Sequence, residues 1–162
     1  MRKTFKLLLI VILLLSLTSC AVIPAYNYDK IVVILDNHGY TVNYTDMFGV
    51  DGIGAYIHAV KEDTGDELYY IYCDKIKYAE SLYEYIDSQR TAKIAELKMN
   101  IERIEKMLNS ENVTPAEKGD YYEEYVIYKE ELQEVQRYNC GKGFNVVWYG
   151  TKQAILDIRK GK

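Results

Sequence analysis

The chain has 162 residues, a length typical of a single domain. Its 24 acidic residues outnumber its 20 basic residues, for a formal net charge of −4 at pH 7. Binding to nucleic acid, like a polybasic grip on anionic lipid, depends on Lys and Arg, so the acidic balance argues against both. The 17 tyrosines are spread through the chain, which favours Tyr as the ordinary core aromatic over a Tyr-lined binding surface.

The N-terminal segment has the plan of a secretory signal peptide. Three basic residues, Arg2, Lys3 and Lys6, precede an apolar run at residues 7–15. The run is too short for a spanning helix, because about 20 apolar residues are needed to cross roughly 30 Å of hydrocarbon. A basic start stays in the cytoplasm, so the sequence predicts export of the remaining chain.

The apolar run is followed by Leu17-Thr18-Ser19-Cys20, an aliphatic residue, two small residues and a cysteine. This motif resembles the lipobox of bacterial lipoproteins. The resemblance implies that Cys20 receives a diacylglyceryl group, that residues 1–19 are removed, and that the protein is held on the outer face of the cell membrane. The remaining 143 residues have 17 basic and 24 acidic side chains, a formal charge of −7, so the lipid alone has to anchor them.

Two alternatives to lipidation stay open. Residues 7–23 can form a short uncleaved anchor, or the signal can be removed without lipid; both leave the body outside the cytoplasm. The body itself resembles small uncharacterised lipoproteins of low-GC Gram-positive bacteria in length and composition. The predicted organisation is a signal peptide at 1–19, a lipidated tether at 20–27 and one domain at 28–162.

The first part of that domain predicts a helix followed by three strands. Ile31, Ile34 and Leu35 recur at helical spacing, and Gly39 is placed to end the helix in the left-handed conformation. The strand candidates are residues 40–45, 54–62 and 67–74. Asp63, Thr64, Gly65 and Asp66 join the last two strands and predict a hairpin turn.

A long helix is predicted over residues 75–108, where Leu97, Ile101, Ile104 and Leu108 follow at the spacing of a coiled-coil seam.

A second helix begins after a polar loop. Thr114 is placed as its N-cap, Pro115 takes the first helical position and Glu117 can close a capping box. Two such helices joined by a short loop predict an antiparallel hairpin, which we expect to project from the domain at about residues 90–138.

The C-terminal part predicts a turn at 139–143, a strand at 144–150 and a last helix at 152–160 with Thr151 as its cap. The element order therefore predicts an α+β fold. We expect a mostly antiparallel four-stranded sheet with helices packed on one face and the hairpin as an insertion.

Cys73 and Cys140 form a candidate disulfide, because they are the two remaining thiols of an exported domain and each lies near a predicted strand end. The alternative is two separate buried thiols.

Residues 45–54 are the only loop that suggests a ligand, because they combine Asp46 and Asp51 with three glycines. Phe48 occupies the alternate position at which a calcium loop needs an oxygen, so we expect at most a weak ion or ligand site there. His38 and His58 have no metal-site spacing, and we expect both to be surface or half-buried. The sequence predicts no metal and no cofactor.

No motif for a nucleophile, a general base or a phosphate loop is present, so the sequence predicts no catalytic residue. We therefore expect a lipid-anchored, non-catalytic protein that binds a protein partner or an envelope component and no nucleic acid. The alternative is a small cell-wall ligand-binding subunit or hydrolase that uses a Tyr-rich surface.

Overall fold

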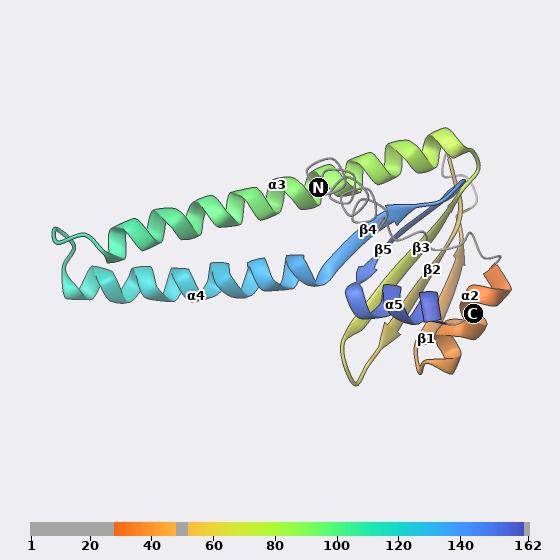
Figure 1. Cartoon of the computed structure of the whole chain (residues 1–162), viewed down its shortest axis with the longest axis horizontal. Coiled ribbons are helices and arrows are strands. Elements are labelled where there is room, and N and C mark those ends of the chain that lie inside the picture. The colour runs from red at the N-terminus through yellow and green to blue at the C-terminus, as the bar shows by residue number, and fades with distance from the viewer. Residues whose placement is uncertain (1–27, 48–51, 161–162) are drawn as a thin grey trace, which may run out of the picture.

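A computed structural model describes residues 28–47 and 52–160 of the chain (Figure 1). In chain order the elements are α2 (Tyr28–Asn37), β1 (Thr41–Asp46), β2 (Ile53–Lys61), β3 (Asp66–Cys73), α3 (Ile76–Leu108), α4 (Pro115–Arg137), β4 (Tyr138–Lys142), β5 (Val146–Thr151) and α5 (Lys152–Lys160). Within these described ranges, no helix has both the length and the apolar character needed to cross a membrane.

The sheet is open and antiparallel, with the strand order β1-β2-β3-β5-β4. The predicted α+β class and the antiparallel sheet are confirmed, but the number of four strands is wrong. The missing strand is β4, which occupies the residues predicted as a turn at 139–143. Asn139, Gly141 and Lys142 are poor strand formers, and pairing with β5 overrides that weak local preference.

One face of the sheet is covered by α2 and α5 (Figure 1). The main core lies between these two helices and the strands. Its largest fully buried side chains include Ile31, Leu35, Ile57, Leu68, Tyr70 and Ile158. The predicted end of α2 is confirmed, since Gly39 after it has a φ of +80°. The predicted cap of α5 is also confirmed, since the Thr151 hydroxyl accepts a hydrogen bond from the Ala154 N–H.

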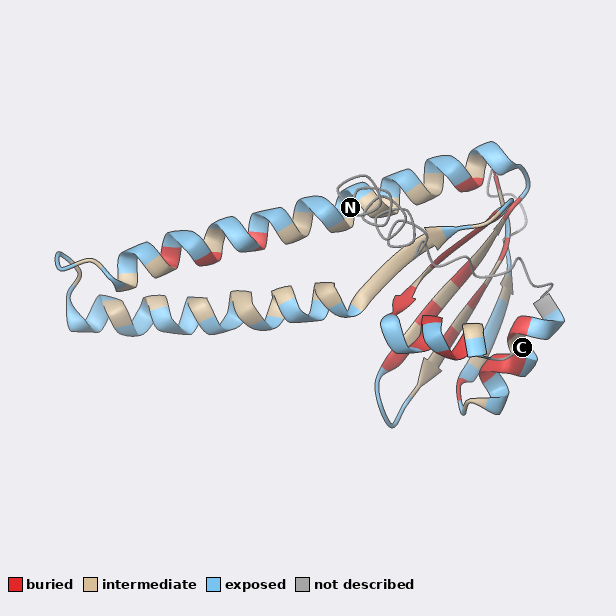
Figure 2. Ribbon diagram, viewed as in Figure 1, coloured by how far each residue is buried: buried red, intermediate tan, exposed pale blue. Residues whose placement is uncertain are grey.

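The other face of the sheet is covered in part by the first turns of α3, so the prediction of helices on one face only is wrong. Ala79 of α3 is buried in a second cluster with Cys73 and Val147, and Ile71 packs against it. The reason lies in the second half of β3, where Ile71 and Cys73 place apolar side chains on this face and need cover there. In Figure 2 the sheet-side end of α3 accordingly has a buried position.

Beyond the sheet, α3 and α4 continue side by side as an antiparallel hairpin, which we call the arm (Figure 1). The two helices span Ile76–Leu108 and Pro115–Arg137, so the arm ends one residue before the predicted limit and its first helix begins over the sheet. At 1.5 Å per residue, α3 is about 50 Å long. Leu97, Ile101 and Ile104 are buried along the seam that faces α4.

Candidate functional site

The root of the arm is held by a cluster of polar aromatic side chains around Glu67. The carboxylate of Glu67 lies 2.6 Å from His58 Nε2 and accepts hydrogen bonds from the hydroxyls of Tyr69 (3.0 Å) and Tyr138 (2.9 Å). The His58 and Tyr69 rings stack with centroids 4.4 Å apart, and Tyr138 stacks on Tyr149 at 5.0 Å. The cluster joins β2, β3, β4 and β5 on the sheet face that α3 covers only in part.

Electrostatics in the cluster favour an ionised Glu67. Burial raises the pKa of this carboxyl, but the hydrogen bonds from His58, Tyr138 and Tyr69 outweigh burial and leave the pKa lowered. Burial and the bond to Glu67 raise the pKa of Tyr138 well above its ordinary value. His58 Nε2 and the two hydroxyls all contact Glu67, so the arrangement ties the four strands together.

Two arginines fix the helices of the arm to the sheet. Arg90 of α3 donates through Nε to the Tyr138 carbonyl (2.9 Å) and through Nη2 to Asn139 Oδ1 (3.3 Å). Arg137, the last residue of α4, donates through Nη2 to the Gly65 carbonyl in the β2–β3 turn (3.3 Å). Both helices are therefore tied to the strands where the arm leaves the sheet, which sets the direction of the arm.

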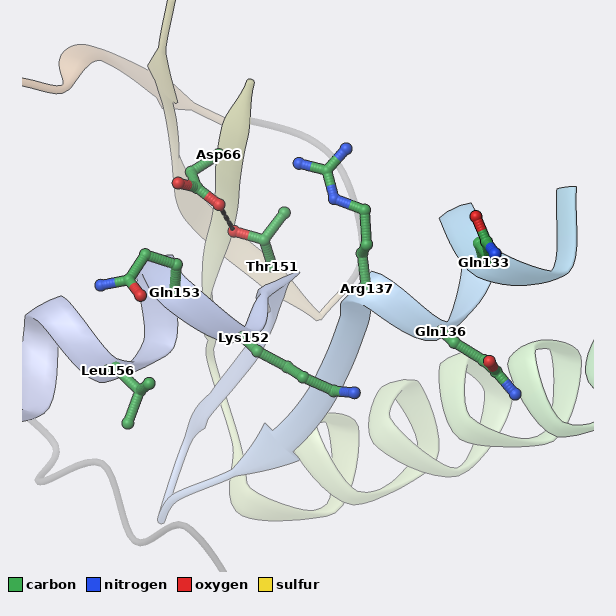
Figure 3. A pocket seen from close by; sticks show the side chains of 8 residues that line it. All are labelled: Asp66, Gln133, Gln136, Arg137, Thr151, Lys152, Gln153 and Leu156. Carbon is green, nitrogen blue, oxygen red and sulfur yellow. Dashed lines mark hydrogen bonds between the residues drawn. The ribbon is translucent and has the colours of Figure 1, made fainter. Parts of the chain in front are cut away.

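A shallow cleft of about 400 Å³ lies where α4, β5 and α5 meet (Figure 3). Its lining residues are Asp66, Gln133, Gln136, Arg137, Thr151, Lys152, Gln153 and Leu156. Carboxamides and two cations give it a polar wall, and Leu156 is its one aliphatic side chain.

Two of the three charged side chains of the cleft, Asp66 and Arg137, are bonded to neighbouring residues of the chain. Asp66 accepts from the hydroxyls of Thr151 (2.8 Å) and Thr64 (2.7 Å), and Arg137 pairs with Glu134 at 3.0 Å. Lys152 forms no ion pair with any residue in the described part of the chain. The cleft can hold a small polar ligand by hydrogen bonds. Its one hydroxyl–carboxylate pair, Thr151 with Asp66, is buried in the fold, with 2% and 8% of each residue exposed.

The sequence-predicted lipid and ion-loop residues are only partly described. Cys20, the expected lipid attachment point, and Asp51 lie outside the described residues. Asp46 ends β1 as an exposed side chain whose Oδ1 accepts a hydrogen bond from the Tyr44 hydroxyl. Among the residues that the structure describes, no three His, Cys, Asp or Glu side chains are grouped to hold a metal ion.

The structure does not bring Cys73 and Cys140 together, and both are free thiols. Cys140 of β4 pairs with Tyr149 of β5, and Tyr149 pairs with Tyr69 of β3. Cys73 lies two strands away from Cys140 and four residues further along β3 than Tyr69. With strands about 4.8 Å apart and a rise of about 3.3 Å per residue, the two Cα atoms are about 16 Å apart, beyond the roughly 7 Å that a disulfide spans. The thiol of Cys140 instead donates to Asp87 Oδ1 of α3 at 3.4 Å.

Sequence reasoning missed the cluster around Glu67. His58 is half-buried as expected, but its role depends on β2–β3 pairing, which sets it opposite Tyr69. The alternation of side chains then places His58, Glu67 and Tyr69 on one face. The predicted turn at residues 63–66 would set His58 opposite Ile71; the structure has the turn at residues 62–65, which sets His58 opposite Tyr69. The part of Tyr138 was not predictable, because its neighbours at 139–143 predict a turn rather than a strand.

Comparison with protein-family models, with curated proteins and with solved structures finds no match to this chain.

Proposed function

We propose that the protein is a lipoprotein, exported and anchored through Cys20 on the outer face of the cell membrane, that presents the arm to a protein partner without catalysing a reaction. The anchoring half of this proposal is supported by the basic start, the apolar run and the Leu17-Thr18-Ser19-Cys20 motif. The binding half is supported by the arm.

The arm is the observation that carries the proposal. Its apolar seam is filled internally, since Leu97 and Ile104 are fully buried between the helices. The arm therefore folds without a partner and is fixed at its root by Arg90 and Arg137. Large apolar side chains nevertheless remain on its outer surface: Tyr122 is 61% exposed and Ile127 60%. A stiff projection with exposed apolar side chains is suited to recognition, because amphipathic helices are common binding elements.

Two variants test the two halves of the proposal separately. Replacing Cys20 by Ala removes the thiol that would carry the lipid, and we expect the protein to lack the diacylglyceryl group and the signal segment to stay uncleaved. Mass spectrometry of the native N-terminus measures both effects. A mature protein that begins elsewhere, or a Cys20 that carries no lipid, contradicts the anchoring half.

The second variant shortens the arm. Residue 101 of α3 and residue 128 of α4 lie at the same position along the arm. Both are between the Lys93–Glu131 ion pair (3.0 Å) and the Arg103–Glu124 ion pair (3.8 Å) that join the two helices. Replacing residues 101–128 by a short Gly-Ser loop removes the distal arm and keeps both roots. We expect the variant to stay anchored and to lose its cross-linked partner in the cell envelope. An unchanged set of cross-linked proteins contradicts the binding half.

The cleft supports a second candidate function, the binding of a small cell-wall ligand. The observation that favours it is the set of three glutamines with Lys152, which offers donors and acceptors for hydroxyl and amide groups. Calorimetric titration with soluble wall-glycan fragments tests it. We expect heat that Lys152→Ala and Gln133→Ala both reduce; binding that neither change affects places the ligand elsewhere.

A further inference from the structure

The face of α4 that points away from α3 is acidic and apolar. Five exposed residues define this surface, which we call the outer strip: Tyr122, Glu123, Val126, Ile127 and Glu130. Their spacing places them within about 140° of one another on a helix of 3.6 residues per turn. The opposite side of α4 carries the residues that face α3, among them Tyr125, whose hydroxyl donates to Glu105 Oε1 at 3.3 Å.

The negative charge of the outer strip is not neutralised within the described residues. Glu124 and Glu131, on the flanks, pair with Arg103 and Lys93 of α3. Glu123 and Glu130 have no such partner among the ion pairs of the described chain.

The nearest cation is turned inward. Lys129 is the one basic residue between positions 119 and 136. It lies 4.0 Å from Glu105 and 5.1 Å from the centre of the Tyr125 ring, so it faces α3 and the seam. The outer strip therefore combines three large apolar side chains with two carboxylates and has no positive charge of its own.

We propose that the outer strip is the docking surface for a basic amphipathic helix of the partner protein. The inference rests on the proposed function and names the class of its partner. Apolar side chains of such a helix cover Tyr122, Val126 and Ile127, while its Lys or Arg side chains meet Glu123 and Glu130. A second copy of this chain fits poorly, because α4 has seven acidic and three basic residues and two copies repel.

The proposal is tested with a synthetic probe. The probe is a fluorescent helical peptide of about 18 residues with Leu on one face and Lys on the other. Two reference peptides carry Glu in place of Lys, or the same residues in scrambled order. The full chain is held in phosphatidylcholine nanodiscs, binding is followed by fluorescence anisotropy, and empty nanodiscs give the background.

Two strip variants and two matched controls decide the outcome. The strip variants are Val126→Ser with Ile127→Ser, and Glu123→Lys with Glu130→Lys. The controls lie on α3: Met99→Ser, at a side chain 64% exposed, and Glu102→Lys, an exposed carboxylate without an ion pair in the described part. Exposed changes of this kind alter stability by about 0.5 kcal/mol or less, and circular dichroism confirms that each variant is helical.

We expect the Lys peptide to bind, each strip variant to weaken binding about tenfold or more, and the α3 controls to leave it unchanged. Binding should also weaken with added salt, because exposed charges are screened.

Equal binding of the Glu peptide, strip variants that bind like the parent, or a signal no larger than that of empty nanodiscs overturns the proposal. Self-association that the strip variants abolish also overturns it, in favour of a second copy. Cys20→Ala leaves peptide binding intact, so a failure of the anchoring proposal is distinguishable.

Discussion

The Tyr138 hydroxyl donates a hydrogen bond of 2.9 Å to Glu67 Oε2. This bond joins the first residue after the arm to β3. Tyr138 is also the residue whose carbonyl Arg90 binds from α3. One carboxylate on β3 and one arginine on α3 therefore position the junction between α4 and β4. The direction in which the arm projects depends on this junction.

Replacing Glu67 by Gln tests the junction through the pH dependence of stability. The folded-state pKa of Glu67 is lowered, so its charge stabilises the fold above the ordinary Glu pKa of about 4.3 and loses that effect as the pH falls through the folded-state value. We expect Glu67→Gln to reduce the free energy of unfolding by about 1–3 kcal/mol at pH 7. The difference should shrink below about pH 4. Urea denaturation at several pH values measures it.

Glu84→Gln is the matched control, because Glu84 is an exposed carboxylate of α3 without an ion pair in the described part of the chain. Its stability should follow that of the parent at every pH. A Glu67→Gln protein as stable as the parent at pH 7 would show that the cluster does not hold the junction.

The thiol of Cys140 should react slowly in the folded protein. Burial raises its pKa to about 11, and the hydrogen bond to Asp87 and the charge of that carboxylate act in the same direction. Because the ordinary thiol pKa is about 8.5, we expect alkylation at pH 8 to be about a hundredfold slower than in urea. Iodoacetamide labelling, followed by mass spectrometry of the peptide that contains Cys140, measures the rate.

Asp87→Asn removes the charge beside the thiol and leaves its burial unchanged, so it should speed labelling of Cys140 about three- to tenfold. A native rate close to that of the unfolded chain contradicts the burial of Cys140.

Features specified by neighbouring residues were predictable from the sequence. The capping residue Thr114 and the apolar seam through Leu97 each depend on a few positions close in the chain, and both are present. The hairpin turn predicted at residues 63–66 is also present, but at residues 62–65. The fifth strand was not predictable in this way, because β4 is formed by pairing with β5 rather than by its own composition.

The candidate sites needed long-range information. Periodicity predicts that α3 has an apolar face, but it does not say which side of the sheet that face covers. The cleft combines residues of α4 and α5 with Asp66, and the cluster combines Glu67 with Tyr138, 71 positions apart. Only the outer strip lies within one helix, and its meaning depends on knowing which side of α4 faces α3.

Gly141 should be intolerant of a side chain because of the tryptophan that covers it. A Cβ at Gly141 would lie 2.5 Å from two ring carbons of Trp148. We expect Gly141→Ala to lower the free energy of unfolding by about 1–3 kcal/mol. Since Trp148 is the single tryptophan of the chain, its emission should shift as well.

Gly119→Ala is the control for Gly141, because Gly119 lies in α4 with no atom within 4 Å of an added Cβ. It should raise helix stability by about 0.5–1 kcal/mol and leave the tryptophan emission unchanged. If both alanine variants behave alike, the close packing of Trp148 on β4 is wrong.

The start of α4 depends on the capping box. The Thr114 hydroxyl accepts from the Glu117 N–H, and Glu117 Oε2 accepts from the Thr114 N–H at 2.8 Å. We expect Thr114→Ala to destabilise the helix by about 1 kcal/mol, while Thr114→Ser retains the acceptor. Hydrogen exchange of the amides at residues 115–118 measures the effect. Exchange that is equally fast in both variants would show that the box contributes nothing.

Leu97→Ala tests whether the arm is held by its own seam. Leu97 is fully buried between α3 and α4, and removing its side chain should cost about 2–5 kcal/mol, the range for a buried leucine. The loss should be confined to the arm, because the main core lies on the opposite face of the sheet. Hydrogen exchange should therefore quicken in the distal parts of α3 and α4 and stay slow in β2, β3 and β5.

Met99→Ala is the control for Leu97→Ala, because Met99 lies two positions away and is exposed; it should change stability by about 0.5 kcal/mol or less. Equal effects of the two changes, or loss of protection throughout the sheet, would contradict an arm that folds as a separate unit on a fixed root.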